Sequence, residues 1–367
     1  MSLTLDLRHD GPPLDFRAAI PEGRITALVG PSGSGKTSIL RVIAGLLRLS
    51  YARIALGGEA WDDARLHRLT RERPIGFVPQ QYGLFPHMTA VGNVEAALIH
   101  LATRERRARA QDCIALAHVA GMEARYPHEL SGGQKQRVAL ARAIAREPRV
   151  LLLDEPFSAV DPSTRKRLYV ELRRLHEQLQ TTVVLVTHDL DEAAQLASHL
   201  CLICHGRLLQ AGPTADVLTR PCCEQAARLL DIPNVFQAQA ESAPSGRMLL
   251  LRWGPHTLRV TGHLPEGASP ALRWAVLPTN VLLARNDKPW GSHLENPIPA
   301  VVEEVIALGA EAVVWLCPRG VPDTLLQMRL PARAVRRYTV VAGAGVTVCL
   351  RAADIIPLGH EDGETQR

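Results

Sequence analysis

The stretch GPSGSGKT at residues 30–37 constrains the fold of this chain more than any other, because it stands between an apolar run, GRITALVG, and a helix-like segment, TSILRVIAGLL. A glycine-rich turn in that context lets backbone N–H groups point at phosphate oxygens at the start of a helix. The pattern G-x-x-x-x-G-K-[ST] therefore predicts an α/β core with a nucleotide phosphate site. We expect the whole loop to contact the nucleotide, through Gly30, Pro31, Ser32, Gly33, Ser34, Gly35, Lys36 and Thr37.

Two side chains of this loop and two acids further along carry the specific chemistry. Lys36 is expected to hold the β- and γ-phosphates, and the Thr37 hydroxyl to bind Mg²⁺. In RVLLLDEP two adjacent acids follow an apolar run. We expect Asp154 to hold the same magnesium ion, usually through water, and Glu155 to orient an attacking water or accept its proton.

Three continuously apolar runs indicate strands that are buried on both faces of a mainly parallel sheet. They lie at residues 23–30, 149–154 and 181–188. Ligands of such sheets bind beyond the carboxyl ends of the strands. We therefore expect Gly30, Asp154 and His188 to converge on one crevice, where the His188 imidazole reaches a γ-phosphate.

The pattern changes along the chain. An α/β pattern spans residues 1–233 and is interrupted by a helical insert at about 84–130. Between 234 and 357, short alternating segments are separated by Gly, Pro, Asn or Asp, which predicts a separate small β-barrel or sandwich. Residues 358–367 are expected to form a loose tail.

The composition is that of an ordinary folded protein, with 46% hydrophobic and 22% charged residues. The net charge of +5 is mild and favours no particular anionic partner. No apolar run approaches the roughly 20 residues of a membrane helix, and the start, MSLTLDLRHDG, lacks the apolar segment of a signal peptide. We expect the chain to stay in the cytoplasm.

The stretch LSGGQ at 130–134 is a second helix start that suits an anion, because its N–H groups and serine hydroxyl are free to bind one. It has no lysine and so cannot form a complete nucleotide site. We infer that Ser131, Gly132, Gly133 and Gln134 complete the site of a second copy of the chain. ATP then joins the two copies head to tail, and hydrolysis releases them.

In their order along the chain, these motifs resemble those of the ATP-binding cassette transporter ATPases. They are the Walker A motif at 30–37, the glutamine at Gln80, the signature at 130–134, LLLDE at 151–155, SAVD at 158–161 and the histidine at His188. The resemblance implies that Glu155 is the general base, that His188 contacts the γ-phosphate and that Gln80 links the magnesium site to a membrane partner. It also places Asp161 in the dimer contact.

The segment YGLFPHMTAVGNV resembles the importer version of the family, whose surface receives a coupling helix from a membrane permease. Tyr82, Phe85 and Met88 are candidates for lining that groove. The implied partners are a second copy of the chain, permease subunits and, indirectly, a periplasmic or extracellular solute-binding protein. The implied location is peripheral, on the cytoplasmic face of the inner membrane.

The β-rich end resembles the OB-like or Mop-like accessory domain of importer ATPases, and GSHLENPIPAVVEEV is closest to the ATPase subunits of molybdate importers. Within that segment the chain departs from the family at Glu295, an acid where a base is usual. Near the end it has Arg351 and Ala352 where Lys-Ser is usual. Because an acidic side chain opposes oxyanion binding, we do not expect this domain to sense an anion directly.

A second departure concerns the nucleotide base. Many relatives stack adenine on an aromatic side chain near the first strand, but SLTLDLRHDGPPL contains no Phe, Tyr or Trp. Adenine is then held by aliphatic contacts or by His9. We expect other nucleoside triphosphates to be partly accepted.

The leading hypothesis is the motor subunit of an importer, with molybdate or a related oxyanion as the solute and polyamine, sulfate or ferric ion as alternatives. A rival of another class is a soluble cassette ATPase that acts on nucleic acid through an OB-like module. Such modules interleave aromatic with basic residues, whereas the aromatic residues of the β-rich end are widely spaced. We therefore expect no nucleic-acid partner.

Overall fold

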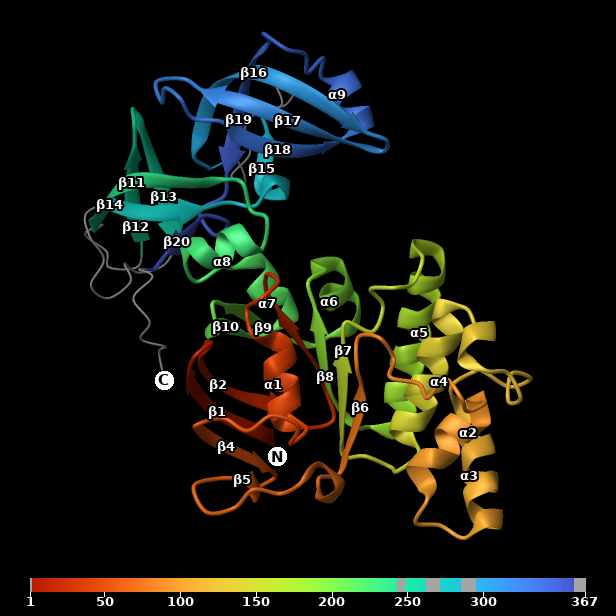
Figure 1. Cartoon of the computed structure of the whole chain (residues 1–367). Helices are drawn as coiled ribbons and strands as arrows, with labels where there is room; N and C mark the ends of the chain where they lie inside the picture. Colours follow the sequence, from red (N-terminus) through yellow and green to blue (C-terminus); the bar gives the residue numbers. More distant parts are fainter. Residues whose placement is uncertain (1, 243–247, 262–270, 285–294, 360–367) are drawn as a thin grey trace. The chain divides into compact units, whose positions relative to one another are not determined.

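The computed structural model describes residues 2–242, 248–261, 271–284 and 295–359 (Figure 1). The chain divides into two compact units between Val217 and Leu218, within helix α7 (Thr214–Thr219). Within the described residues, no helix is both long enough and apolar enough to cross a membrane.

The second unit includes helix α8 (Glu224–Leu229), which precedes the boundary expected after residue 233. Two contacts tie this segment to the strands of its own unit. The backbone N–H of Gly359 donates to the Cys222 carbonyl at 2.8 Å, and the Arg273 guanidinium lies 2.5 Å from the Glu224 carboxylate. The boundary after residue 233 stays a prediction about where a separately folding domain begins.

The first unit is built on a ten-stranded sheet in the order β5-β4-β1-β2-β10-β9-β3-β8-β7-β6. Its strands are β1 (Ser2–Asp10), β2 (Pro13–Pro21), β3 (Ile25–Val29), β4 (Tyr51–Leu56), β5 (Glu59–Asp62), β6 (Ile75–Val78), β7 (Val150–Asp154), β8 (Thr182–Thr187), β9 (His199–Cys204) and β10 (Arg207–Pro213). The five strands from β6 to β9 along this order pair in parallel, while β1 pairs antiparallel with both β2 and β4.

Strands β3, β7 and β8 are buried at every position, as their apolar runs predict. Their register brings their carboxyl ends to one edge of the sheet. Val29 pairs with Thr187, and Asp154 pairs with Val186. The residues that follow β3, β7 and β8 therefore emerge side by side.

The helices of the first unit lie beside this sheet or pack on one another (Figure 1). They are α1 (Lys36–Ile43), α2 (Ala90–Glu95), α3 (Thr103–Leu116), α4 (Gly132–Ile144), α5 (Pro162–Leu179), α6 (Leu190–Leu196) and α7 (Thr214–Thr219), with short 3₁₀ turns at Thr70–Glu72, Ala96–Leu98 and Pro127–Glu129. The predicted helical insert forms α2 and α3, separated by a turn in which the Leu101 N–H donates to the Leu98 carbonyl at 2.9 Å. This turn allows both helices to pack against α4.

The described residues of the second unit form two five-stranded antiparallel sheets, in the orders β13-β12-β11-β14-β20 and β15-β19-β16-β17-β18. Their strands are β11 (Val235–Ser242), β12 (Met248–Trp253), β13 (His256–Thr261), β14 (Ala271–Ala275), β15 (Val281–Leu283), β16 (Pro297–Leu308), β17 (Glu311–Pro318), β18 (Leu326–Pro331), β19 (Gly345–Leu350) and β20 (Ile356–Leu358). A short 3₁₀ turn at Pro278–Asn280 and helix α9 (Ala332–Arg337), which the strand pattern did not predict, complete the unit.

The core of the second unit contains two large aromatic side chains. Trp253 and Trp274 are 3% and 0% exposed and meet edge to face with ring centroids 5.2 Å apart.

Leu358 lies in β20, and Gly359 forms a β-bridge with Cys223, so the expected tail does not begin at residue 358. The remainder of that predicted tail, residues 360–367, lies outside the described residues.

Candidate functional site

The loop that follows β3 has the shape of a phosphate cradle. Three of its positions accept only glycine without strain. A Cβ on Gly30 would lie 2.0 Å from the Ile203 carbonyl oxygen. Gly33 and Gly35 have φ values of 80° and 94°, which L side chains rarely adopt. The loop therefore turns tightly from β3 into α1.

Lys36 lies inside this loop, with only 5% of its surface exposed. Its Nζ donates to the carbonyl oxygens of Gly30 and Pro31, both at 2.8 Å. Burial lowers the pKa of Lys36, and the carboxylates of Glu155 and Asp154 act in the opposite direction. The Lys36 amine is thus shielded from water and lies close enough to Glu155 and Asp154 to interact with their charge.

Thr37 and Asp154 form an oxygen-rich pair between α1 and β7. The Thr37 Oγ1 hydroxyl donates to Asp154 Oδ1 at 2.9 Å, and Asp154 is 3% exposed. Burial raises the pKa of Asp154, while the hydrogen bond from Thr37 lowers it. Hydroxyl and carboxylate oxygens are ligands that Mg²⁺ prefers.

The Glu155 carboxylate lies between two side chains from neighbouring strand ends. Gln80 Nε2, which follows β6, donates to its Oε2 at 3.1 Å, and His188 Nδ1, which follows β8, is 3.5 Å from its Oε1. Glu155 itself has a φ of 44°, in the left-handed region, and its backbone N–H donates to the Val186 carbonyl at 3.0 Å. The register of β6, β7 and β8 thus brings Gln80, Glu155 and His188 together, as the strand ends predicted for His188.

One cavity of about 540 Å³ joins these residues to a part of the site that the motifs do not describe. Lys36, Thr37, Gln80, Glu155 and His188 line it on the side of β6, β7 and β8. On the side of β1 and β2 it is lined by His9, Pro12, Pro13, Leu14, Leu47 and Leu49.

The signature stretch forms the N-terminus of α4 and is capped within itself. Ser131 Oγ accepts the Gln134 N–H at 3.3 Å, and Gln134 Oε1 accepts the Ser131 N–H at 2.9 Å. A Cβ on Gly132 would lie 2.9 Å from the Ala159 carbonyl, so this stretch packs closely on the SAVD turn. In the part of the chain that the structure describes, residues 130–134 do not line the cavity.

Asp161 ends the SAVD turn and caps α5. Its Oδ1 accepts the Ser163 hydroxyl at 2.7 Å and the Thr164 N–H at 3.0 Å. These bonds hold the pKa of Asp161 well below its usual range. A Cβ on Gly133 would lie 3.1 Å from Thr164 Cγ2, so α4 and α5 begin against each other.

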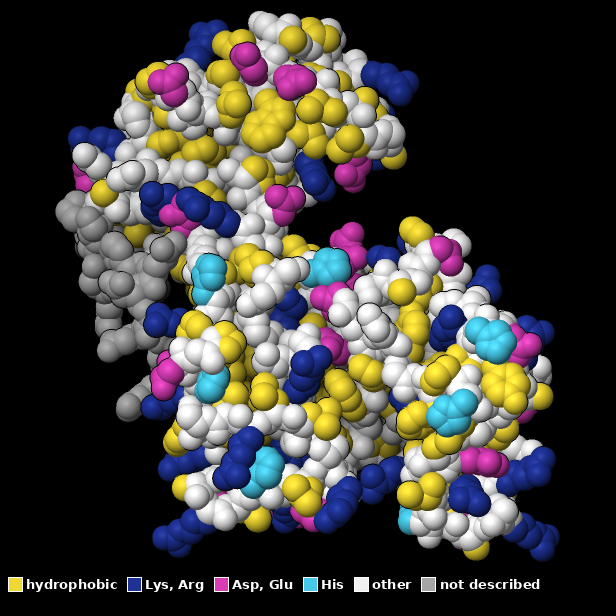
Figure 2. Space-filling view, in the orientation of Figure 1, with side chains coloured by type: hydrophobic (Ala, Val, Ile, Leu, Met, Phe, Trp, Pro, Cys, Tyr) yellow, Lys and Arg dark blue, Asp and Glu magenta, His cyan; other side chains and the backbone are white. Residues whose placement is uncertain are grey.

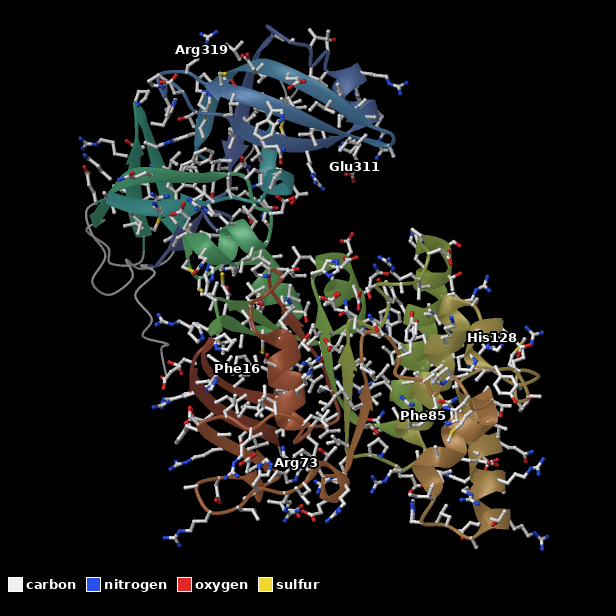
Figure 3. All side chains as sticks on the ribbon, in the orientation of Figure 1. Phe16, Arg73, Phe85, His128, Glu311 and Arg319 are labelled. Atoms are coloured by element: carbon white, nitrogen blue, oxygen red, sulfur yellow. The ribbon has the colours of Figure 1, made fainter. Side chains whose placement is uncertain are left out.

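The motifs did not identify Arg73, which supports α1 from its C-terminal end (Figure 3). Its guanidinium is buried and donates to the carbonyls of Val42 and Ile43 at 2.9 and 2.8 Å. It also donates to Asp62 Oδ2 at 3.0 Å. Because these partners are distant in sequence and two are backbone groups, no spacing pattern signals them.

The loop after Gln80 differs in one respect from the expected groove. Phe85 is 43% exposed, as a groove-lining residue should be, but Tyr82 is 7% exposed and lies beneath the surface. Asn93 holds this loop: its Oδ1 accepts the Phe85 N–H at 2.7 Å, and its Nδ2 donates to the carbonyls of Phe85, Met88 and Thr89, each at 3.1 Å.

In the second unit, Glu295 occupies the position that the molybdate comparison singled out. Its Oε2 accepts the Ala352 backbone N–H at 2.6 Å, and the neighbouring Asn296 bonds to the backbone of Arg259 and Leu350. The Glu295 carboxylate thus occupies the Ala352 N–H group with a hydrogen bond from within the chain. The preceding residues of that segment, Ser292, His293 and Leu294, lie outside the described residues.

Comparison with known proteins agrees with this geometry. Residues 14–158 match the ABC transporter family. The chain is 36% identical over 357 residues to the sulfate/thiosulfate import ATP-binding protein CysA of Ralstonia nicotianae, covering 94% of this chain and 92% of that protein. It is also 36% identical to the molybdenum import ATP-binding protein ModC of Thiobacillus denitrificans, covering 94% of each chain.

A solved structure shows the same likeness in three dimensions. The dimeric post-hydrolysis state of the ATP-binding cassette MJ0796, bound to ADP and Pi, aligns with a TM-score of 0.50 and 32% identity, covering 58% of this chain and 98% of that one. Together with the relatives that match almost the whole chain, this likeness identifies the family. The chain belongs to the ABC transporter family, as an ATP-binding ATPase subunit of the importer type.

Proposed function

We propose that this chain is the motor of an oxyanion importer, in which two copies bind two MgATP molecules, close, and change the facing side of a membrane permease. The observation that carries the proposal is the cluster of Lys36, Glu155 and His188 on one cavity, in a chain that matches import ATPases along nearly its whole length. The signature residues Ser131 and Gln134 hydrogen-bond to each other, and residues 131–134 lie outside the described lining of this cavity. This placement supports their use by a second copy.

Glu155 is the proposed general base. Its carboxylate is held by the Gln80 amide on one side and faces the His188 imidazole on the other, so it is positioned to take a proton from water. His188 and Lys36 are the proposed contacts of the γ-phosphate, where negative charge gathers during phosphoryl transfer.

Thr37, Asp154 and Gln80 fit the magnesium ion that the family uses, because each offers an oxygen ligand and the first two are already 2.9 Å apart. When bound there, the ion neutralises charge on the β- and γ-phosphates. The remaining steps, binding of the phosphates and acceptance of the proton, belong to the side chains of the chain.

Substitution of Glu155 by Gln tests the catalytic assignment. We expect Glu155→Gln to reduce ATP hydrolysis by on the order of 10²–10⁴ while ATP binding is kept, because only the proton acceptor is lost. Gel filtration should then show a stable ATP-bound dimer. Glu177→Gln, an exposed change on α5, is the matched control and should hydrolyse ATP normally. Undiminished turnover in Glu155→Gln would remove Glu155 from the mechanism.

The permease is proposed to dock on the loop that Asn93 holds and that exposes Phe85 beside α2 (Figure 3). This places the motor peripherally, on the cytoplasmic face of the inner membrane, with a solute-binding protein on the far side. The buried Tyr82 is not part of the proposed contact surface.

The proposed solute is a tetrahedral oxyanion of the sulfate and molybdate type, since relatives named for each match this chain equally well, at 36% identity. Uptake of radiolabelled sulfate and of molybdate, compared in cells with and without the chain, tests this choice. Loss of polyamine or ferric-ion uptake with both oxyanions unaffected would contradict it.

The nucleic-acid alternative would need aromatic side chains on the surface of the second unit. Two of those in the described residues, Trp253 and Trp274, are buried in its core, and Trp315 is half-buried. On the face shown in Figure 2, Lys and Arg side chains are dispersed among acidic and apolar ones rather than gathered in one stripe. We therefore propose that this unit serves the transporter rather than a nucleic acid.

A further inference from the structure

The turn that carries Gln80 ends in an unusual backbone. The Tyr82 N–H donates to the Pro79 carbonyl at 2.8 Å, which closes a β-turn with Gln80 at one of its two central positions. Tyr82 and Gly83 then have φ values of 63° and 56°. A tyrosine adopts this left-handed conformation only at a cost in free energy. The end of the turn therefore needs a contact from outside to hold it.

Arg142, on α4, supplies that contact. Its Nη1 donates to the Gly83 carbonyl at 2.6 Å, and its Nη2 donates to the Tyr82 carbonyl at 2.9 Å. The guanidinium carbon also lies 5.6 Å from the centre of the Phe85 ring, within the range of a cation–π contact (Figure 3). One planar group thus holds three residues of the loop in a fixed geometry.

The Arg142 guanidinium acts on this loop rather than on a neighbouring charge. Arg142 is half-buried, burial lowers its pKa, and no carboxylate of the described residues offsets that shift. By contrast, Arg137 lies five residues earlier on the same helix, and its Nε is 2.9 Å from the Glu171 carboxylate. The hydrogen bonds to the loop carbonyls are therefore the main compensation for taking the Arg142 charge out of water.

The loop meets α4 at a second place. A Cβ on Gly132, in the first turn of α4, would lie 4.0 Å from the Tyr82 hydroxyl oxygen. The Tyr82 ring is buried, so it packs near the start of the helix while Arg142 binds the Tyr82 carbonyl near its end. Because α4 is one continuous helix of 13 residues, these two contacts fix the loop to a single rigid element.

We propose that Arg142 is a positioning residue for ATP hydrolysis, which acts by keeping the Gln80 amide against the Glu155 carboxylate. This inference rests on the proposed function, in which Glu155 takes a proton from water. Gln80 Nε2 reaches Glu155 Oε2 at 3.1 Å from a turn that begins on β6 and is bound to α4 at its other end. Loss of the guanidinium frees that second end, and the amide then no longer has a fixed direction.

Steady-state hydrolysis by the full chain tests this role. We expect Arg142→Met to lower kcat about 10- to 100-fold, because small displacements of catalytic groups cost this much. KM for ATP should stay within about threefold, since Arg142 is not among the described residues that line the nucleotide cavity. Arg146→Met is the matched control. Arg146 is exposed just beyond α4 and donates to the Arg71 carbonyl at 3.3 Å, so its loss should alter neither constant.

Combination with Gln80→Ala separates positioning from a general structural role. If Arg142 acts through Gln80, then Arg142→Met should lower kcat no further once residue 80 is alanine. A double variant whose kcat falls by the product of the two single losses would overturn the proposal, because a loss of folded protein multiplies in this way. Normal kcat in Arg142→Met alone would overturn it as well.

Arg142→Lys keeps the proposal testable if Arg142→Met does not fold. Lysine retains the charge but cannot hold two carbonyls in a planar fork, so kcat should fall about 3- to 10-fold, again with no further loss beside Gln80→Ala. Full activity of Arg142→Lys would remove the two-carbonyl contact from the argument and the proposal with it.

The outcomes also distinguish this inference from the proposed function. Undiminished turnover in Glu155→Gln would overturn the proposed function and this inference together. Slow turnover in Glu155→Gln beside normal turnover in Arg142→Met would remove the role of Arg142 and leave the proposed function intact.

Discussion

Replacement of Arg73 by methionine should destabilise the first unit strongly, although Arg73 lies outside the cavity lining. Arg73 is 1% exposed, and its guanidinium bonds to the carbonyls of Arg68, Val42 and Ile43 and to the Asp62 carboxylate. Burial lowers the pKa of Arg73, and the bond to Asp62 opposes that shift. Methionine fills much of the same space but leaves all four acceptors without this donor.

The expected loss of stability follows from the contacts that Asp62 keeps once the guanidinium is gone. Asp62 is 6% exposed and, within the described part of the chain, would keep only the contact to His67 Nδ1, at 2.8 Å. Removal of one partner from a buried ion pair costs about 3–5 kcal/mol. For a unit of roughly 200 residues, each kcal/mol lowers Tm by about 2–4 °C, so the transition should move by on the order of 10 °C.

Differential scanning calorimetry of the full chain measures this change, because the two units can melt separately. Arg68→Met is the matched control: it removes an ion pair with Glu59 that is partly exposed and should cost no more than about 1 kcal/mol. Asp62→Leu combined with Arg73→Met should recover part of the loss, since no buried charge is then left alone. An Arg73→Met protein that melts within 1–2 °C of the unaltered chain would refute the reasoning.

Three further changes have defined outcomes. Burial raises the pKa of Glu192 from 4.5 to about 8, so its protonated form favours the folded state; this contribution is complete below about pH 4.5 and lost as pH rises through 8. Glu192→Gln should therefore flatten the dependence of the denaturation midpoint on pH over that range, and an unchanged slope would contradict the assignment. Ser131→Arg, placed in the Glu155→Gln background, should bind ATP as a monomer but form no dimer on gel filtration; a dimer would argue against the shared site. The Tyr82 hydroxyl is buried with no hydrogen-bond partner among the described residues, so Tyr82→Phe should be neutral or stabilising by up to about 1 kcal/mol in urea denaturation, and a clear loss of stability would show a partner was overlooked.

The sequence predicted the tight loop between β3 and α1 because that loop is made by local backbone geometry. Gly33, Gly35 and Lys36 act within one turn, and their spacing alone determines where N–H groups and amine point. The strand ends were predictable for a related reason: continuous apolar runs mark buried parallel strands, and parallel strands present their carboxyl ends at one edge.

What the sequence did not predict depends on contacts between distant residues. Leu47 and Leu49 reach the cavity from a segment whose composition is ordinary, and Arg73 bonds to backbone carbonyls about 30 residues away. The resemblance to importer ATPases led us to expect Tyr82 on a surface groove, yet the left-handed backbone at Tyr82, with a φ of 63°, accompanies a buried ring. The amino-acid composition of a loop does not show which way a side chain points at one residue with an unusual backbone conformation.

The four hydrogen bonds of Asn93 have a consequence for association. They fix the loop from Phe85 to Thr89 at both of its ends before any partner arrives. A preorganised loop gives up little conformational entropy on binding, so more of the contact energy with a partner remains as affinity. Binding of a partner also does not require this loop to fold first. Two such epitopes, one on each copy, would present the same rigid shape through every turnover.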